Sequence, residues 1–362
     1  GGIKLMAIID KPSDYFNTIL YTGNASSPRT ISGVGFSPDL VWNKCIDGGD
    51  HRLLDQVRGA NKEFAPNRTL AEFSNNSDGN LTAFTSDGFT ITAGSTNINN
   101  WNKSSDGYVS WDWKANGSGS SNTAGSINST VSVNTESGCS IVTYSGTNGT
   151  ATVGHGLGTK PNWIWCKALS AVKNNTVYHS SLGATKSVYL DETSAATTSY
   201  DYWADTEPTS TVFTVKKDGS YDETNGSGIN YVAYCFSERQ GFSKFGSYVG
   251  NGNANGPFIY TGFKPAFIIQ KNSSSSGGNW LLYDNARSPS NLVTRLLRPN
   301  HDTAEIVSSA DETVDFLSNG WKPRGTSNNN NNYNGVSYIY MAFAENPFVT
   351  STSNGSIPAT AR

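Results

Sequence analysis

The sequence predicts an all-β fold made of three tandem antiparallel β-sandwich repeats of the jelly-roll or concanavalin-like kind. Three observations support this prediction. One pattern of turns, strands and aromatic residues occurs three times, helical periodicity is nearly absent, and short β-branched or aromatic runs are bounded by Gly, Asn, Asp and Pro. At least five strand candidates per ~100 residues fit a compact sandwich.

Each repeat begins with a tyrosine-containing strand and a proline turn, after which an apolar run ends in a lysine six residues beyond the proline. An aromatic strand closes the repeat, and its first tyrosine lies 70, 70 or 73 residues after the proline. The prolines are Pro38, Pro161 and Pro265, the lysines are Lys44, Lys167 and Lys271, and the closing strands are 108–113, 231–236 and 338–343. Asp-Gly and Asn-Gly pairs between the strands supply hairpin turns.

These landmarks divide the chain into three repeats with short flanking segments. The residues of 116–135 are rich in Gly, Ser and Asn and indicate a flexible linker, whereas the second and third repeats follow each other closely. Three similar units could pack around a pseudo-threefold axis, or form a linear string. The expected segments are an N-terminal extension (1–15), repeat 1 (16–115), the linker (116–135), repeat 2 (136–240), repeat 3 (241–350) and a C-terminal tail (351–362).

The composition narrows the class of protein. Charged residues make up 15% of the 362 residues and aromatic residues 12%, which is typical of extracellular or virion β proteins. The net charge of −3 gives no electrostatic reason to expect nucleic acid or an anionic membrane as a partner. No run reaches the ~18 apolar residues of a membrane span, and no signal peptide is visible. The four scattered cysteines are expected to be buried thiols, with one disulfide as the alternative.

Two recurring polar sets have a structural and a functional interpretation. The three lysines could form a threefold ligand site, but lysines that protect strand edges from pairing are the favoured interpretation. Asp55 and Arg58 share their spacing with Asp284 and Arg287, whereas the second repeat has His179 and Leu182 at these places. Because a catalytic carboxylate would not survive that replacement, we expect structural ion pairs.

No cofactor, metal or catalytic site is expected. The residues of 47–51 could offer oxygens to Ca²⁺ but lack a calcium-loop pattern, so a polar hairpin loop is favoured. The histidines show no metal spacing, and no nucleophile elbow is present. The glycine-rich residues of 154–158 precede a strand and therefore cannot place phosphate on a helix N-terminus. A pair of carboxylates that cleaves glycosides stays open as an alternative, because the repeats single out no such pair.

One feature favours ligand binding. The loop before each closing strand carries an aromatic residue among polar ones: Trp101, Tyr221 and Tyr333. Sugar rings stack on such faces while Asn, Ser and Asp provide hydrogen bonds. These three residues are therefore the candidate glycan-binding residues, and the alternative is that they fold back onto the core.

Several motifs together resemble a family of uncharacterised virion proteins of tailed phages that infect marine bacteria. The likeness runs from about residue 11 to the C-terminus and implies a phage structural protein, of the tail-fibre or lectin-like type, with concanavalin-type sandwiches. It supplies no catalytic residues. The motifs are found at 16–24, 35–42, 57–60, 154–158, 178–183, 231–236 and 342–348.

The sequence therefore predicts a non-enzymatic virion protein of the receptor-binding kind that contacts host-surface glycan on the outside of the particle. Its expected partners are other virion proteins and a host glycan, and we expect a homotrimer or a pseudo-threefold monomer. Two alternatives stay open: a capsid decoration or appendage protein without a ligand, and a glycan depolymerase.

Overall fold

The structure is a computed structural model that describes residues 8–74, 77–95, 100–308, 311–326, 329–352 and 355–358, with the backbone alone after residue 350. It confirms the all-β prediction, because antiparallel sheets account for the fold and the described helical structure is a single 3-10 turn, η1 (Pro12–Asp14). Within these residues, the search for a helix long and apolar enough to cross a membrane finds none.

Three four-stranded units, here called the first, second and third main sheets, share one strand order. In each, the closing strand lies between the start strand and the lysine-bearing strand. The lysine-bearing strand pairs on its other side with the strand that follows it in the sequence. The first is β1 (Phe16–Thr22), β7 (Gly107–Trp113), β3 (Leu40–Cys45) and β4 (Arg52–Asp55). The second is β10 (Cys139–Ser145), β16 (Asn230–Phe236), β12 (Trp163–Ala168) and β13 (Thr176–His179). The third is β17 (Ser243–Val249), β25 (Ser337–Pro347), β19 (Phe263–Asn272) and β20 (Trp280–Asp284).

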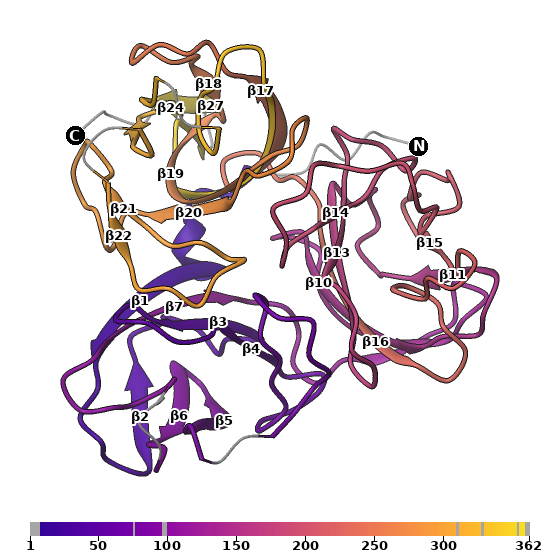
Figure 1. Cartoon of the computed structure of the whole chain (residues 1–362). Coiled ribbons are helices and arrows are strands. Elements are labelled where there is room, and N and C mark those ends of the chain that lie inside the picture. The colour runs from indigo at the N-terminus through magenta and orange to yellow at the C-terminus, as the bar shows by residue number, and fades with distance from the viewer. Residues whose placement is uncertain are drawn as a thin grey trace.

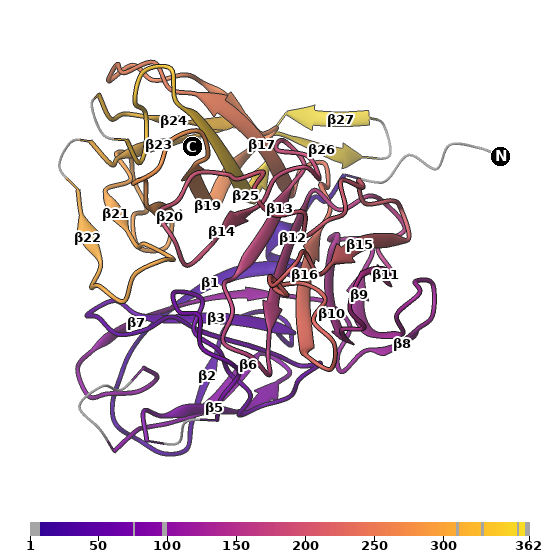
Figure 2. The ribbon, with the colours of Figure 1, turned by 45° about the vertical axis from the view of Figure 1, so that its right-hand side comes forward.

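A smaller sheet lies on the outer side of each main sheet (Figure 1). A separate apolar cluster fills each of these three layers. The small sheets are β2 (Arg29–Ser32), β6 (Gly88–Thr92) and β5 (Asn80–Thr85); β11 (Thr150–Gly154) and β15 (Val212–Lys216); and β18 (Ile259–Tyr260), β24 (Gly320–Pro323) and β23 (Val314–Leu317). Two further hairpins are β21 (Arg295–Leu296) with β22 (Ile306–Val307), and β26 (Val349–Thr352) with β27 (Gly355–Pro358), which projects from the body in Figure 2.

The inner faces of the three main sheets meet in one shared apolar core (Figure 1). Aromatic rings from all three sheets contact one another there: the ring centroids are 5.4 Å apart for Trp42 and Trp165, and 5.8 Å apart for Trp163 and Trp280. The main sheets therefore lie around a common centre rather than in a linear string. Because both faces of each main sheet are covered, β3 and β12 are buried along their whole length, and their sequences are nearly continuous apolar runs.

One local device recurs in every main sheet and explains the spacing of the sequence pattern. The closing-strand tyrosine stacks on the start-strand tyrosine, and its hydroxyl accepts a hydrogen bond from the backbone N–H five residues earlier. An asparagine lies six residues before the closing-strand tyrosine. Its side-chain oxygen accepts a hydrogen bond from the backbone N–H of the residue three positions after the start-strand tyrosine. The tyrosine pairs are Tyr21–Tyr108, Tyr144–Tyr231 and Tyr248–Tyr338, and the asparagines are Asn102, Asn225 and Asn332.

The prediction of a flexible linker over 116–135 is wrong for the residues that form strands. Residues within 116–135 form β8 (Ser120–Asn122) and β9 (Ser129–Asn134), and β9 pairs with β10 along its whole length. These two strands and β14 (Val188–Tyr189) extend the second main sheet to seven strands. The segment forms strands although it is rich in glycine and serine, because Val131 is buried in the apolar cluster between the second main sheet and its small sheet. Burial of this side chain stabilises β9.

Candidate functional site

The structure separates the three aromatic residues predicted to bind glycan. Trp101 is fully buried: its indole Nε1 donates to Glu63 Oε2 (3.2 Å) and its ring packs against Phe89. The prediction of a surface role for Trp101 is therefore wrong, because an apolar cluster under the first small sheet holds the ring. Tyr221 and Tyr333 are exposed by 44% and 49%, but they lie in different parts of the molecule and form no common site. Tyr333 lines none of the grooves described below.

Tyr221 forms a pair with Tyr200, which the sequence did not single out. The two ring centroids are 4.1 Å apart and the ring planes are tilted by 45°. A tight turn holds Tyr221, because its backbone exchanges two hydrogen bonds with Asp218. Asp218 Oδ2 also accepts the backbone N–H of Asp201, directly after Tyr200, at 2.9 Å. The loops that carry both rings are thus tied together.

The tyrosine pair borders a groove of about 300 Å³ whose other walls carry hydrogen-bonding groups. Glu192 is fixed in it, since Asn174 Nδ2 donates to its Oε1 (2.5 Å) and Ser194 Oγ to its Oε2 (2.8 Å). Glu223 is buried on the same wall, and its Oε2 accepts no hydrogen bond of standard geometry from the described residues. The lining residues are Asn174, Tyr189, Glu192, Ser194, Ala195, Thr197, Ser199, Tyr200, Tyr221 and Glu223. We call this surface the tyrosine groove.

Electrostatics make the two carboxyl groups different. Burial raises the pKa of the Glu223 carboxyl, and Lys173 and the Tyr202 hydroxyl only partly oppose the effect. Glu192, by contrast, has a donor on each oxygen. The groove therefore offers aromatic faces, a fixed hydrogen-bond acceptor and a second carboxyl group, which together suit a molecule with hydroxyl groups and apolar ring faces.

The polar residues that recur in the sequence lie where the main sheets meet. We name these contacts junction 1–2, junction 3–1 and junction 2–3 after the main sheets that they join. At each, a backbone N–H of one repeat donates to a carbonyl of the next sheet at 2.7 to 3.0 Å. That carbonyl lies two residues after the lysine that recurs in each repeat. The pairs are Glu72 to Leu169, Glu305 to Ile46 and Ala196 to Ser273.

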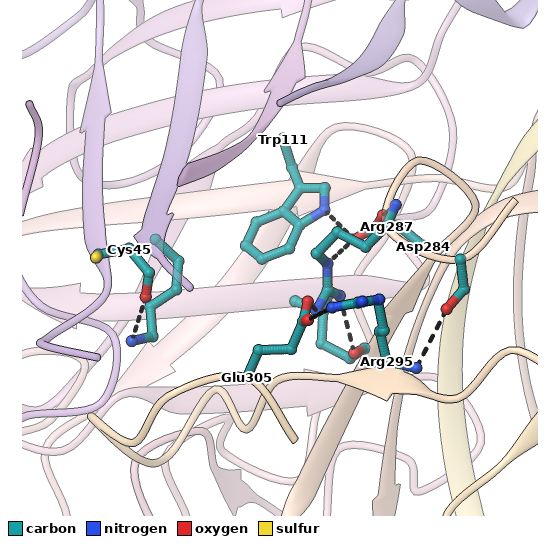
Figure 3. A network of polar contacts seen from close by, with 9 residues as sticks. Cys45, Trp111, Asp284, Arg287, Arg295 and Glu305 are labelled. Carbon is teal, nitrogen blue, oxygen red and sulfur yellow. Dashed lines mark hydrogen bonds and ion pairs between the residues drawn. The ribbon is translucent and has the colours of Figure 1, made fainter. Parts of the chain in front are cut away.

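Figure 3 shows the polar network of junction 3–1. Arg287 Nε donates to Asp284 Oδ2 (2.6 Å), and its Nη1 donates to Glu305 Oε1 (3.1 Å). Trp111 of the first sheet donates its indole N–H to Asp284 Oδ2 (3.1 Å), and Arg295 pairs with Glu305 at the rim. The predicted structural ion pair is confirmed here, since both members of the Asp284–Arg287 pair are buried.

Junction 1–2 repeats this network with different residues. Arg58 bonds Asp55 (2.6 Å) and Glu72 (2.9 Å), and the hydroxyl of Tyr234 donates to Asp55 Oδ2 (2.7 Å). At junction 2–3 the network is missing, and His179 Nε2 instead contacts the backbone carbonyl of Tyr340 (3.0 Å). The predicted pair of Asp55 and Arg58 is thus also a structural ion pair.

The interpretation of the three lysines as edge protectors is wrong. Lys44, Lys167 and Lys271 are fully buried, and their strands β3, β12 and β19 lie inside the sheets. Their ammonium groups donate to backbone carbonyls, and two of them reach a neighbouring repeat: Lys44 at Asp302 (3.4 Å) and Lys167 at Thr69 (3.0 Å). Burial lowers the pKa of Lys44 and of Lys167 to about 8 and that of Lys271 to about 7. Lys44 and Lys167 therefore tie junctions 3–1 and 1–2, whereas Lys271 donates to the Gly278 carbonyl of its own repeat.

One group of side chains has metal-ligand atom types at short range. Cys45 Sγ and carboxylate oxygens of Asp47 and Asp106 lie within 4.8 Å of one another. Burial raises the pKa of the Cys45 thiol, which works against the thiolate that a metal ligand needs. Asp47 Oδ2 already accepts the Gly107 N–H (2.6 Å), in the hairpin loop predicted between β3 and β4. The four cysteines are free and buried, as expected.

Comparison with known proteins places the chain in one family. Residues 11–347 match the family described as Domain of unknown function (DUF7483). Since this match spans most of the chain, the protein belongs to that family. No curated protein and no solved structure matches the chain.

Proposed function

We propose that this member of the DUF7483 family is a carbohydrate-binding virion protein of the tail-fibre or receptor-binding kind, without catalytic activity. The observation that supports the proposal most is the tyrosine groove, with the exposed Tyr221 and the half-buried Tyr200 beside the fixed carboxylate of Glu192. Host-surface glycan is the proposed ligand class.

The groove has the two contacts that sugar recognition needs. A pyranose ring presents an apolar face of C–H groups, which packs on a tyrosine ring, and equatorial hydroxyl groups, which donate to carboxylates. Tyr200 and Tyr221 provide the first contact, and Glu192 with Glu223 the second. Asn174 and Ser194 hold Glu192 in place, so little side-chain entropy is lost when a hydroxyl group binds.

The same groove is a poor fit to glycoside cleavage. A general acid and a nucleophile or base must both be free to act on the scissile bond. Glu192 instead accepts hydrogen bonds at both oxygens from neighbouring side chains, which fix its position. We therefore assign the pair of glutamates to binding.

The proposal also covers the architecture. We propose that the chain consists of three tandem repeats of one antiparallel sandwich of jelly-roll or concanavalin-like type, supported by the shared strand order of the main sheets and by the recurrent tyrosine pairs. The resemblance to marine phage proteins supports a place on the virion. A fold with many non-local strand pairs, locked at three junctions, suits a particle that must survive outside the host.

The test is binding of the purified chain to an array of bacterial surface polysaccharides and to intact bacteria. We expect saturable binding that Tyr221→Ala and Tyr200→Ala each weaken about tenfold, since one lost aromatic contact of about 1.4 kcal/mol corresponds to that factor. Tyr260→Ala is the matched control, because Tyr260 is exposed by 58% and lies outside the groove. Its binding should equal that of the unchanged protein.

The other outcomes lead to different functions. A folded protein that binds neither cells nor glycans would overturn the proposal in favour of a capsid decoration or appendage protein. Release of reducing ends from a bound polysaccharide, lost in Glu192→Gln and Glu223→Gln, would show a depolymerase.

A further inference from the structure

The start strands of the three main sheets differ in whether another strand covers their outer edge. In the second sheet, β9 covers β10, so that β10 lies between β9 and β16. In the first and third sheets, β1 and β17 stand at the end of the strand order and pair with one strand only among the described residues. The chain thus contains one covered start strand and two uncovered ones, in sheets that otherwise share their order.

Side-chain burial shows that β1 has apolar surface left to cover. In β10, Val142 and Tyr144 are 0% and 4% exposed under β9. The equivalent residues of β1, Ile19 and Tyr21, are only half-buried, and Leu20 between them is 47% exposed. In β17 the residue equivalent to Ile19 is Gly246, which has no side chain to cover. The first sheet therefore has the stronger reason to accept another strand.

The backbone of β1 has free capacity at its centre. Alternation in an antiparallel ladder directs the backbone groups of Thr18, Leu20 and Thr22 away from β7. Local groups occupy the two ends, because Asn17 Oδ1 accepts the Thr18 N–H (2.9 Å) and Arg29 donates to the Thr22 carbonyl (2.6 Å). Leu20 is left at the middle of the exposed edge.

A groove beside β1 lacks a wall that its counterpart has. The groove at junction 1–2, of about 490 Å³, is lined by β10, by Arg58 and Glu72, and also by Ser129 and Thr130 of β9. The groove at junction 3–1, of about 450 Å³, is lined by Leu20 and Tyr21 of β1 and by Arg287 and Glu305, with no strand in the place of β9. A strand added to β1 would complete it.

We propose that the β1 edge is a docking site for an extended strand of another protein chain, one that alternates valine with Ser, Thr or Asn as β9 does. The added strand would form main-chain hydrogen bonds with Leu20, and one of its valines would lie opposite Ile19, as Val131 lies opposite Val142. Because the chain already covers β10 with the sequence Ser129-Thr130-Val131-Ser132-Val133-Asn134, that pattern defines the partner's chemistry.

The probe is a labelled synthetic peptide with the sequence of residues 127–135, added to the full chain. We expect saturable binding, and hydrogen exchange should show new protection of the β1 amides while those of β10 stay as they were. Leu20→Pro removes the central N–H and should weaken binding at least about tenfold. The matched control is Ser247→Pro, at the equivalent place on β17, which should leave peptide binding unchanged.

Ile19→Ser decides the case if Leu20→Pro does not fold, because it keeps every backbone N–H of β1 while it removes an apolar side chain that is only half-buried, and it should also weaken binding. The proposal is overturned if the peptide does not bind, if protection appears at β10 through displacement of β9, or if both β1 variants bind the peptide like the unchanged chain. A concentration-dependent dimer that Leu20→Pro abolishes would overturn it in favour of pairing with a second copy.

Discussion

Junctions 3–1 and 2–3 occupy the same place between neighbouring sheets but are built from different chemistry. Junction 3–1 buries Asp284, Arg287 and Glu305, whose charges pair with one another. Junction 2–3 has His179, Leu182 and Ala196 in the corresponding places, and the hydrogen bonds described across it each involve a backbone group. One backbone arrangement thus tolerates both a buried ion network and a nearly apolar contact.

The facing strand explains which solution is used. Trp111 donates an indole N–H to Asp284, and Tyr234 donates its hydroxyl to Asp55 in junction 1–2. The third sheet has Met341 at the equivalent place, which has no donor, and there His179 contacts the carbonyl of Tyr340 instead. A buried carboxylate is therefore present only where the neighbouring sheet supplies a donor, as the cost of burying an unpaired charge requires.

The largest effect should come from breaking the polar junction at one residue. Arg287→Ala leaves Asp284 and Glu305 in a buried place without their main partner, and we expect a loss of about 3 to 5 kcal/mol in the free energy of unfolding. Urea denaturation measures it. Arg295→Ala at the exposed rim is the control and should cost less than about 1 kcal/mol.

A triple variant separates the effect of losing the ion pairs from the effect of leaving an unpaired charge buried. Asp284→Asn, Arg287→Met and Glu305→Gln together remove every charge of the core network, as junction 2–3 does naturally. This protein should be at least about 2 kcal/mol more stable than Arg287→Ala, since replacing a whole buried ion pair is often neutral. Equal stability of the two variants would contradict this account of the junctions.

Junction 2–3 should lose stability in acid through His179, as junction 3–1 should through the buried His51, which contacts the Arg298 carbonyl (3.2 Å). Burial lowers the pKa of His179 to about 4, so the folded protein keeps this side chain neutral, whereas the unfolded chain takes up a proton near pH 6.5. The stability contribution is complete above pH 6.5 and is lost as the pH falls towards 4, by roughly 3 kcal/mol in total.

The measurement compares the unchanged protein with His179→Gln from pH 7 to pH 4.5. The variant should be less stable at pH 7, but its stability should fall less steeply with acid. Because the other titrating groups are common to both proteins, the difference between the two curves isolates His179. Parallel curves would show that His179 does not titrate as its burial implies.

The smallest effect should come from the exposed rim of junction 1–2. Lys62 contacts Glu72 at 3.4 Å, but its side chain is 54% exposed. Lys62→Met should change the stability by less than about 0.5 kcal/mol, because solvent and salt screen such a pair. A thermal melt at low and high salt would test this, and a loss above about 1 kcal/mol would show that the rim contributes to the junction.

The sequence predicted which strands are equivalent, because one pattern occurs three times along the chain, but it did not predict how those strands pair in the sheets. The ion pairs were predictable for the same reason, since their replacement by His179 and Leu182 argued against catalysis. The lysines were predicted wrongly, although a signal was available: alternation along β3 places Lys44 on the same face as Leu40 and Trp42, which face the shared core.

The candidate site was predictable only in part. Tyr221 was found from its polar loop, but its partner Tyr200 comes from a separate loop 21 residues earlier in the sequence. Trp101 shows the opposite failure, since a tryptophan in a polar loop folds inward whenever an apolar cluster and an acceptor such as Glu63 are near. Both outcomes depend on tertiary contacts that a local pattern does not encode.

Joining the three sheets in one chain has a genetic consequence. In a homotrimer, each codon specifies the same residue at all three subunit contacts, so an arginine could not be exchanged for leucine at one contact alone. A single gene that encodes all three sheets is free of that rule. Arg58, Leu182 and Arg287 are products of three separate codons, and each contact can acquire substitutions while the other two hold the three sheets together.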